Sequence, residues 1–459
     1  MLNQVFKLSV ATLLLALGGC FSTDLAPDYD EVQQRIADAT GAEGLYVPGE
    51  EGTALERVNE LLEGGLTAQE SVQVCLLNNP ELQVRLLEIG YSTADAVQAG
   101  LFSNPTLEAL LLFPVNGGSM SSELGLLQNL VELWRRPALR RLAEGEVDRV
   151  ILDVAFRAVE LAAQTKSEFY AAFASDAALA VAGENLETAQ DFFELTRERF
   201  VAGAATQVDL NAARAGYLDQ KILVEVLRFE GLEAKRRLAS LLGLPIPATE
   251  LQLIAPPLTV PRWSVDLERA LDIAHENRLD LKAAVKVVEL AWEAIPLERR
   301  RLLRSLGGGV GIEFEGDDLA LGPAVELEIP IFDQNQAQIA KAELRYAQAL
   351  RDLASLEVQV VQEVHGAYGR FVMAQDTARL YQAELLPLRE SSLDLAKESF
   401  AAGKIGFLAV LDAQERLLEA RSEYVIWLEA MASSIPALEA ACGRPILMLQ
   451  SLQESVGTE

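Results

Sequence analysis

Two hydrophobic patterns divide this chain, and they predict two kinds of structure. From Ile339 onward, apolar positions recur at alternating spacings of three and four residues, a heptad seam that favours a helix packed against a partner helix. Between Val310 and Glu315, apolar residues instead alternate with glycine or glutamate, the period of two that a half-buried strand shows. The chain is therefore expected to combine long helices with short strands. The heptad seam comprises Ile339, Ala342, Tyr346, Ala349, Leu353, Leu356 and Val360.

The middle of the chain is duplicated. The stretch RFVAGAATQVDLNAAR at residues 199–214 recurs after 200 residues as SFAAGKIGFLAVLDAQ at residues 399–414. A fainter pair, NPELQVRLLEIG from Asn79 and RLDLKAAVKVVE from Arg278, is offset by 199 residues. Two structural repeats on one plan are therefore predicted. The turn phrases in the stronger pair align Phe200 with Phe400 and Gly203 with Gly403.

Each repeat is predicted to run as helix, two strands, long helix, turn and helix. In the first repeat, Thr67 and Glu70 form a T-x-x-E capping box that starts a helix ending near Gly100. The long helices after the strands have about 60 residues, or roughly 90 Å at 1.5 Å per residue. A coiled coil alone would explain these rods but not the strands. Strands are expected near residues 106–113, 123–131, 309–315 and 321–331, long helices as far as Phe200 and Phe400, and returning helices as far as Leu242 and Ala441.

The N-terminus resembles the leader of a bacterial lipoprotein. Lys7 precedes an apolar run from Leu8 to Gly19, which is too short to span a bilayer but fits the core of a signal peptide. The run ends in LGGC, which resembles a lipobox and makes Cys20 the expected lipid-modified first residue of the mature chain. In such lipoproteins an aspartate directly after the lipid-modified cysteine favours retention in the inner membrane. Because this chain has Phe21 there, sorting to the outer membrane is expected. The predicted divisions are residues 1–19 as signal peptide, 20–66 as lipid-anchored linker, 67–243 as first repeat, 244–264 as proline-rich connector, 265–442 as second repeat and 443–459 as tail.

The net charge argues against a nucleic-acid partner, and the lack of catalytic motifs argues against an enzyme. The formal charge of −29 disfavours binding to a phosphate backbone. Arginines do cluster at residues 135–141 and 299–304, beside strand-like segments, and we interpret these clusters as flanking a membrane. The sequence lacks phosphate-loop, nucleophile-elbow and zinc-protease motifs, so no enzyme activity, cofactor or bound metal is expected. Cys75 and Cys442 could form a disulfide, although buried thiols are the commoner outcome.

The strands indicate the environment. Val310, Ile312 and Phe314 share one face of the first clean strand and are expected to face lipid. The opposite face, expected to line a water-filled lumen, carries Glu313, Glu315, Glu326 and Glu328 from this strand and the next. Soluble sheets also alternate, but about 9 to 11 residues per strand is the length that crosses a bilayer at a tilt. Four strands cannot close a barrel, and open edges in lipid are costly, so several copies must share one barrel.

The chain resembles the TolC-type outer membrane efflux proteins over nearly all of its mature length. The resemblance rests on the lipobox, the duplicated plan, the two turn phrases, QAGLFSNP from Gln98 and EIPIFDQNQAQIAKAE from Glu328. QAGL-x-x-NP and LVELWRRP are also similar to the branch that serves cobalt-zinc-cadmium and copper pumps. The family implies a homotrimer with a shared β-barrel in the outer membrane and a hollow periplasmic cylinder of helices. It also implies an inner-membrane pump, most often of the RND type, and a periplasmic adaptor that docks at the turns containing Phe200, Gly203, Phe400 and Gly403.

The resemblance places a periplasmic gate near the second turn, with departures from the family pattern. Members carry two aspartates three residues apart, with an arginine nearby that helps to close the mouth. Here the two positions hold Ala409 and Asp412, and Ile405 replaces the arginine. Asp209 matches the acidic residue of the first turn. Asp412 and Asp209 are therefore gate candidates, with a helix-start aspartate favoured by the helix dipole as the alternative for each.

Two other functions fit parts of the sequence. A periplasmic coiled-coil spacer or adaptor-like lipoprotein anchored by Cys20 would explain the rods, but it has no use for two hairpins with apolar outer faces. A passive uptake porin would explain the strands but predicts a short periplasmic side. A passive duct takes its substrate from the pump that it docks to, so metal, drug and polypeptide cargo all stay open.

Overall fold

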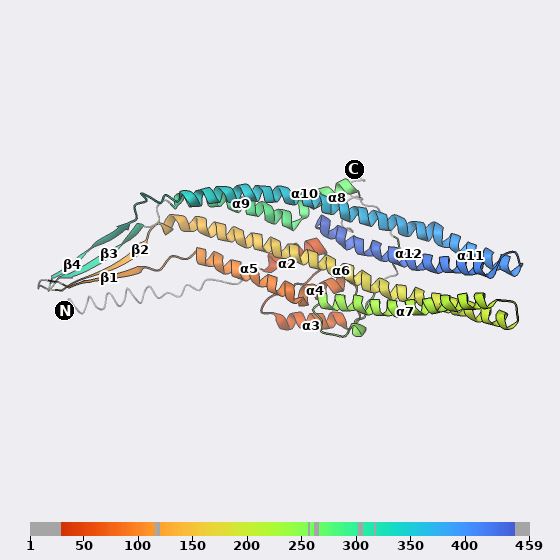
Figure 1. Ribbon diagram of the computed structural model, residues 1–459. Coiled ribbons are helices and arrows are strands. Elements are labelled where there is room, and N and C mark those ends of the chain that lie inside the picture. Colours follow the sequence, from red (N-terminus) through yellow and green to blue (C-terminus); the bar gives the residue numbers. More distant parts are fainter. Residues whose placement is uncertain are drawn as a thin grey trace, which may run out of the picture. The chain divides into compact units, whose positions relative to one another are not determined.

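The computed structural model describes residues 29–113, 115, 120–255, 258–260, 266–301, 306–315 and 318–445. It is mainly helical, with one small antiparallel sheet, as the two hydrophobic patterns predict (Figure 1). The predicted signal peptide, Cys20 and most of the predicted tail lie outside the described residues. The helices are α2 (Tyr29–Thr40), α3 (Glu51–Leu62), α4 (Ala68–Asn78), α5 (Pro80–Ala99), α6 (Glu132–Val201), α7 (Gln207–Leu241), α8 (Leu267–Asn277), α9 (Leu279–Arg300), α10 (Gln336–Leu380), α11 (Leu386–Ala401) and α12 (Phe407–Cys442).

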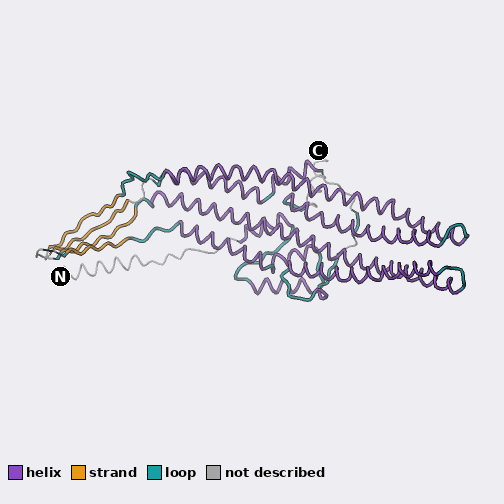
Figure 2. The backbone as a smooth tube through the Cα atoms, viewed as in Figure 1, coloured by secondary structure: helices purple, strands orange, loops and turns teal. Residues whose placement is uncertain are grey.

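The chain forms two compact units. The first contains residues 89–147 and 293–339, and it holds the sheet together with the helix ends that adjoin it. The second contains residues 29–88, 148–292 and the chain from residue 340 onward, and it is helical. The boundaries fall inside α5, α6, α9 and α10, so each unit contains segments of both repeats. Figure 2 shows the strands and helices in separate colours.

The sheet has four strands in the order β1-β2-β3-β4, and every neighbouring pair is antiparallel. The two repeats meet at its centre, where β2 pairs with β3. Residues 328–331, predicted to continue the last strand, leave the sheet because Pro330 has no N–H for a strand ladder. Glu328 therefore lies just beyond the strand on which it was expected. The strands are β1 (Thr106–Leu112), β2 (Ser121–Asn129), β3 (Leu306–Glu315) and β4 (Asp318–Leu327).

The helices depart from the predicted ones at three breaks. The first predicted helix starts at the Thr67–Glu70 capping box, as expected, but divides at Asn79, because the following Pro80 disfavours helical geometry at that residue. Its counterpart in the second repeat divides at Arg278, whose ψ of 125° lies outside the helical region. The long helix before the second turn contains a π-helical turn, Tyr381–Leu385, ahead of Pro387. A π-helical turn relieves the clash between a proline ring and the carbonyl four residues earlier.

The core of the second unit lies where α8, α10 and α12 pack together. Phe371 of α10 is 1% exposed, and Ala270, Met431 and Cys442 join it in one cluster. On the heptad seam of α10, three residues are buried, and the Tyr346 ring contacts Trp292 of α9 with centroids 5.2 Å apart. α12 is long and apolar enough to cross a membrane, but half of its most apolar 18-residue stretch is buried inside the protein. The three buried seam residues are Ala342, Ala349 and Val360.

The two described cysteines are free thiols. Cys75 and Cys442 are both buried, and the Cys75 thiol donates a hydrogen bond to the Leu241 carbonyl at 3.4 Å. Burial raises the pKa of each thiol to about 12. The commoner outcome expected from the sequence is therefore confirmed, and both thiols should be unreactive in the folded protein because the thiolate is the reactive form.

Candidate functional site

The two glycine turns adopt the same geometry. Gly203 and Gly403 have φ angles of +74° and +70°, a left-handed conformation that glycine adopts without strain. In the first turn, the Gly203 and Ala204 amides donate to the carbonyls of Phe200 and Arg199; the second turn repeats both bonds 200 residues later. These paired bonds form a Schellman motif that ends one helix and lets the chain reverse into the next. The turn phrases aligned in the sequence are therefore equivalent in structure.

Aromatic side chains join the two hairpins beside these turns. The Phe192 ring of α6 stacks on Phe407 of α12 at 5.0 Å between centroids, and Phe400 meets Phe407 edge-on at 6.1 Å. The Arg199 guanidinium lies over the Phe400 ring, 4.3 Å from its centroid. A cavity of about 360 Å³ is lined by Arg199, Asp209, Phe400 and Phe407 among others. The turns thus form one end of the second unit, and the equivalent residues Val208 and Leu408 are exposed there, by 67% and 56%.

Asp209 acts as a helix cap in this structure. It is the third residue of α7, and its amide donates to the Thr206 hydroxyl oxygen at 3.2 Å. Its carboxylate accepts hydrogen bonds from the Thr206 amide at 2.8 Å and from the Thr206 hydroxyl at 2.7 Å. The alternative left open for Asp209 in the sequence therefore accounts for its contacts. The matching positions of the second turn, Gly406 and Ala409, have no side chain that could build such a box.

Asp412 does not cap a helix. α12 begins at Phe407, so Asp412 lies beyond the first turn, where the helix dipole acts. Its side chain is 61% exposed and pairs with Arg416, one helical turn away, at 2.9 Å. The helix-start alternative therefore does not account for Asp412, which presents its charge on the surface of the hairpin.

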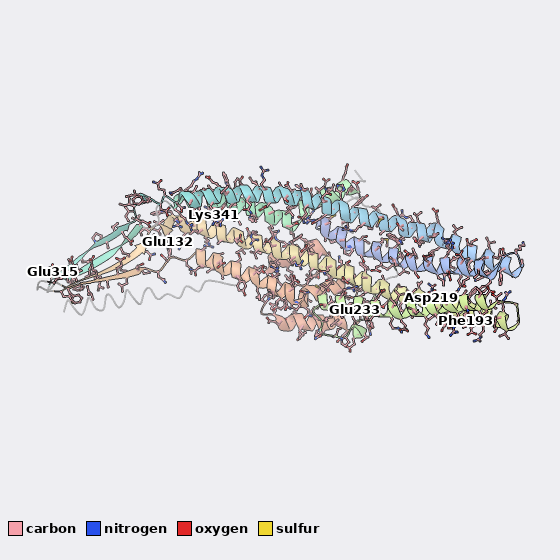
Figure 3. The ribbon with its side chains drawn as sticks, in the orientation of Figure 1. Glu132, Phe193, Asp219, Glu233, Glu315 and Lys341 are labelled. Carbon is pink, nitrogen blue, oxygen red and sulfur yellow. The ribbon has the colours of Figure 1, made fainter. Side chains whose placement is uncertain are left out.

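Two further acidic residues, Glu415 and Asp219, belong to the same cluster as Asp412, and neither was among the candidates predicted from the sequence. Burial and the nearby charges of Asp412 and Asp219 raise the pKa of Glu415. Asp219 on α7 and Glu415 on α12 also line a cavity of about 120 Å³ between the hairpins. Figure 3 labels Asp219 and Phe193, which lie on α7 and α6 of the first hairpin. The spacing of three between Asp412 and Glu415 could have revealed Glu415, whereas Asp219 belongs to the other repeat.

The sheet separates apolar from acidic residues. Strand pairing places Ile312 opposite Leu124 and Leu321, so all three side chains share one face, whereas Glu313 lies opposite Glu123 and Ala320 on the other face. Apolar side chains on the first face are exposed, by 50% at Val310 and 68% at Leu321. Apart from Leu110, Leu112 and Leu127, the second face is acidic or small. Its acidic residues are Glu108, Glu123, Glu313, Glu315, Asp318 and Glu326.

Both edges of this sheet are open. Among the described strands, β1 pairs only with β2, and β4 pairs only with β3. Glu108, Glu123 and Asp318 were not singled out in the sequence, although the alternation in β1 and β2 places the first two on the glutamate face. Figure 3 labels Glu132 beside the helix-proximal end of the sheet and Glu315 at its far end.

A family model described as outer membrane efflux protein matches residues 72–244 and 270–444. The cobalt-zinc-cadmium resistance protein CzcC of Cupriavidus metallidurans is 23% identical over 62% of this chain and 68% of its own. Nodulation protein T of Rhizobium leguminosarum bv. trifolii is 24% identical over 58% of this chain and 59% of its own, so the chain spans less than two thirds of that relative. A crystal structure of CusC, studied for folding and transmembrane channel formation, has a TM-score of 0.68 at 19% identity and covers 82% of this chain and 92% of its own.

Proposed function

The chain belongs to the outer membrane efflux protein family, of the TolC type, and from this membership we propose that it forms the outer membrane duct of a tripartite efflux pump. The family is one of channels and not of enzymes. In the proposed assembly, three copies share one β-barrel, and Cys20 carries a lipid in the outer membrane. A periplasmic adaptor would dock at the turns containing Phe200, Gly203, Phe400 and Gly403, and an inner-membrane pump, of the RND type, would supply the energy.

The sheet is the observation that carries this proposal. It exposes apolar side chains on one face and carboxylates on the other, and neither of its edge strands has an outer partner among the described residues. A bilayer covers an apolar face, and pairing with strands of other copies satisfies open edges, which cost several kcal/mol per unpaired group in lipid. Val310, Ile312 and Phe314 would then face lipid, while Glu313, Glu315 and Glu326 line the lumen, with Glu328 just beyond it. A periplasmic spacer leaves the exposed apolar face without a role.

The acidic lumen favours cations over anions. Carboxylates facing a water-filled passage raise the local concentration of cations and repel anions. The relative CzcC is named for cobalt, zinc and cadmium resistance. We propose metal cations as cargo, passing through without being held: among the described residues, no group of three or more His, Cys, Asp or Glu side chains is placed to hold a metal ion.

The lumen can be tested by cysteine labelling during conduction. Protein reconstituted in a planar bilayer should conduct, and a Glu313→Cys variant should lose conductance when a charged thiol reagent is added, because the label blocks the water-filled passage. An Ile312→Cys variant should be unaffected, because its side chain faces lipid. Cys75 and Cys442 provide a quiet background, since both are buried. Equal block of both variants would contradict the assigned faces, and a protein that does not conduct would support the spacer.

Asp412 should influence ion selectivity at the periplasmic mouth. We propose that a ring of Asp412 carboxylates, one from each copy, attracts cations there, so Asp412→Asn should lower the cation-to-anion permeability ratio. One exposed charge is worth about 1 kcal/mol at 4 Å in water, or roughly fivefold, so losing one charge from each copy should change the ratio by at least about fivefold. Reversal potentials in a salt gradient measure this ratio. Asp394→Asn on α11, exposed on the same hairpin, is the matched control. The gate assignment of Asp412 is wrong if the two variants give the same permeability ratio. For Asp209 we also propose a role in the periplasmic gate, in addition to its capping bonds with Thr206.

A further inference from the structure

Arginines gather where the sheet meets the helices of the first unit. Residues 131–141 and 298–301 contain seven arginines and only two glutamates, in a chain whose net charge is −29. Figure 3 labels Glu132 at this junction. The backbone joins the two segments there, since the Leu130 amide donates to the Leu306 carbonyl at 2.8 Å. We call Arg135, Arg136, Arg141, Arg300 and Arg301 the arginine belt.

Helix stability does not explain the arginines of α6. This helix begins at Glu132, so Arg135 and Arg136 lie near its positive end, where the helix dipole disfavours cations. Arg300 and Arg301 lie at the end of α9, where the dipole favours them, and Arg301 also pairs with Glu298 at 2.7 Å. The α6 arginines therefore need another source of stabilisation.

The belt has more positive charge than its neighbours neutralise. The Arg135 Nε is buried and has no hydrogen-bond partner among the described residues. Burial and the nearby Arg301 guanidinium lower the pKa of Arg135. Arg141 and Arg300 are exposed and form no salt bridge within the described part of the chain. An anion placed here would gain interactions that the protein itself does not supply.

Exposed apolar side chains border the same arginines. Phe102, Leu133 and Trp134 are exposed by 51%, 55% and 50%. The Arg136 guanidinium lies over the Phe102 ring, 3.8 Å from its centroid. Aromatic residues beside long cationic side chains suit a membrane interface, where the rings contact acyl chains and the charges reach the headgroups. A free phosphate ion would make no use of these apolar groups.

We propose that the arginine belt binds the phosphate groups of anionic phospholipids in the leaflet of the outer membrane that faces the periplasm. The proposal rests on the proposed function, because it requires the sheet to span that membrane. The apolar face of the sheet would then contact the acyl chains, and the belt would hold the headgroups at its helix-proximal end. Each arginine near an anionic surface contributes about a fivefold gain in affinity. The belt would thus fix the depth of the sheet in the bilayer.

The test compares charge-removing and charge-keeping variants of the full chain. The triple variant Arg136→Gln, Arg141→Gln, Arg300→Gln should retain phosphatidylglycerol on the order of a hundredfold less well than the wild type, because three contributions of about fivefold multiply. The corresponding Arg→Lys variant should retain it nearly as well, because the charge is kept. Native mass spectrometry of protein from mixed phosphatidylglycerol and phosphatidylcholine nanodiscs counts the bound lipids. A control with Arg197→Gln, Arg228→Gln and Arg236→Gln removes three exposed arginines from the second unit and should behave as wild type.

Conductance separates this proposal from the proposed function. If the wild type conducts but retains both lipids equally, the lipid proposal is overturned and the duct is not. If the belt and control variants lose phosphatidylglycerol to the same extent, the effect is one of net charge and the belt has no special role. Displacement of the lipid by millimolar inorganic phosphate would show a simple anion site and would also overturn the proposal. Should the glutamine variant not fold, the lysine variant and 0.5 M salt, which should weaken retention in the wild type, still decide the question.

Discussion

Replacing Gly309 by alanine should prevent the sheet from forming. A Cβ at this position would overlap the carbonyl oxygen of Leu126 on β2, and its nearest neighbours are all backbone atoms. No rotation of a side chain can relieve such a clash, so β2 and β3 must separate where the two repeats meet. We expect a cost of more than about 3 kcal/mol, above the usual range for overpacking. The yield of membrane-inserted, conducting protein should fall to near zero.

Gly322 provides the matched control within the same sheet. It lies on β4, and a Cβ there would have no atom within 4 Å. Gly322→Ala should change stability by no more than about 0.5 kcal/mol. Equal insertion and conductance of the two variants would show that β2 and β3 do not pair in the register found here.

Substituting Arg278 by alanine should destabilise the helical unit strongly. Its side chain is 3% exposed, and it pairs with Asp280 and Glu363 at 2.6 Å each. Its guanidinium also donates to the Ala441 carbonyl at 3.4 Å, near the end of α12. Removing the arginine leaves the largely buried Asp280 without its cation, whereas the half-exposed Glu363 can be hydrated. Breaking a buried pair costs about 3 to 5 kcal/mol, and we expect the lower end of this range. The thermal unfolding midpoint of the purified protein measures the loss.

A control arginine separates this effect from a general loss of positive charge. Arg236 is 63% exposed and pairs with Glu233 one helical turn away. Arg236→Ala should leave the unfolding midpoint close to that of the wild type, because exposed ion pairs contribute little to stability. Arg278→Lys should fall between the two, because lysine cannot bond both carboxylates with a planar fork. If Arg278→Ala unfolds at the temperature of Arg236→Ala, the buried network contributes little.

Local signals in the sequence were sufficient for the periodic elements. The heptad seam of α10, the Thr67–Glu70 capping box and the alternation in β3 each depend on neighbouring residues, and all three are present. The glycine turns were found by comparing the repeats, because both need a left-handed residue at the same place.

The break at Arg278 and the acidic cluster depend on contacts between distant segments, whereas Pro80 and Pro387 mark the other two breaks locally. No residue near Arg278 predicts that a helix ends there. The backbone turns where it packs closely against Gly443: a Cβ added to Gly443 would lie 3.2 Å from backbone atoms of Arg278. Asn79, at the corresponding position of the first repeat, also contacts a distant segment, because its side-chain amide donates to the Leu241 carbonyl at 2.7 Å. Asp219 and Glu415 likewise come from different repeats, so spacing along the chain could not bring them together.

The capping box at Asp209 has a consequence for the motions of the two hairpins. A threonine N-cap is better than a glycine N-cap by only a few tenths of a kcal/mol, which corresponds to less than about a twofold change in an opening equilibrium. The first turn has this bond network and the second, with Gly406 and Ala409, does not. The start of α12 should therefore unwind more often than the start of α7, although the turns before them are alike. The two copies of the hairpin therefore differ in how firmly the returning helix begins, and the helix with the weaker start carries Asp412.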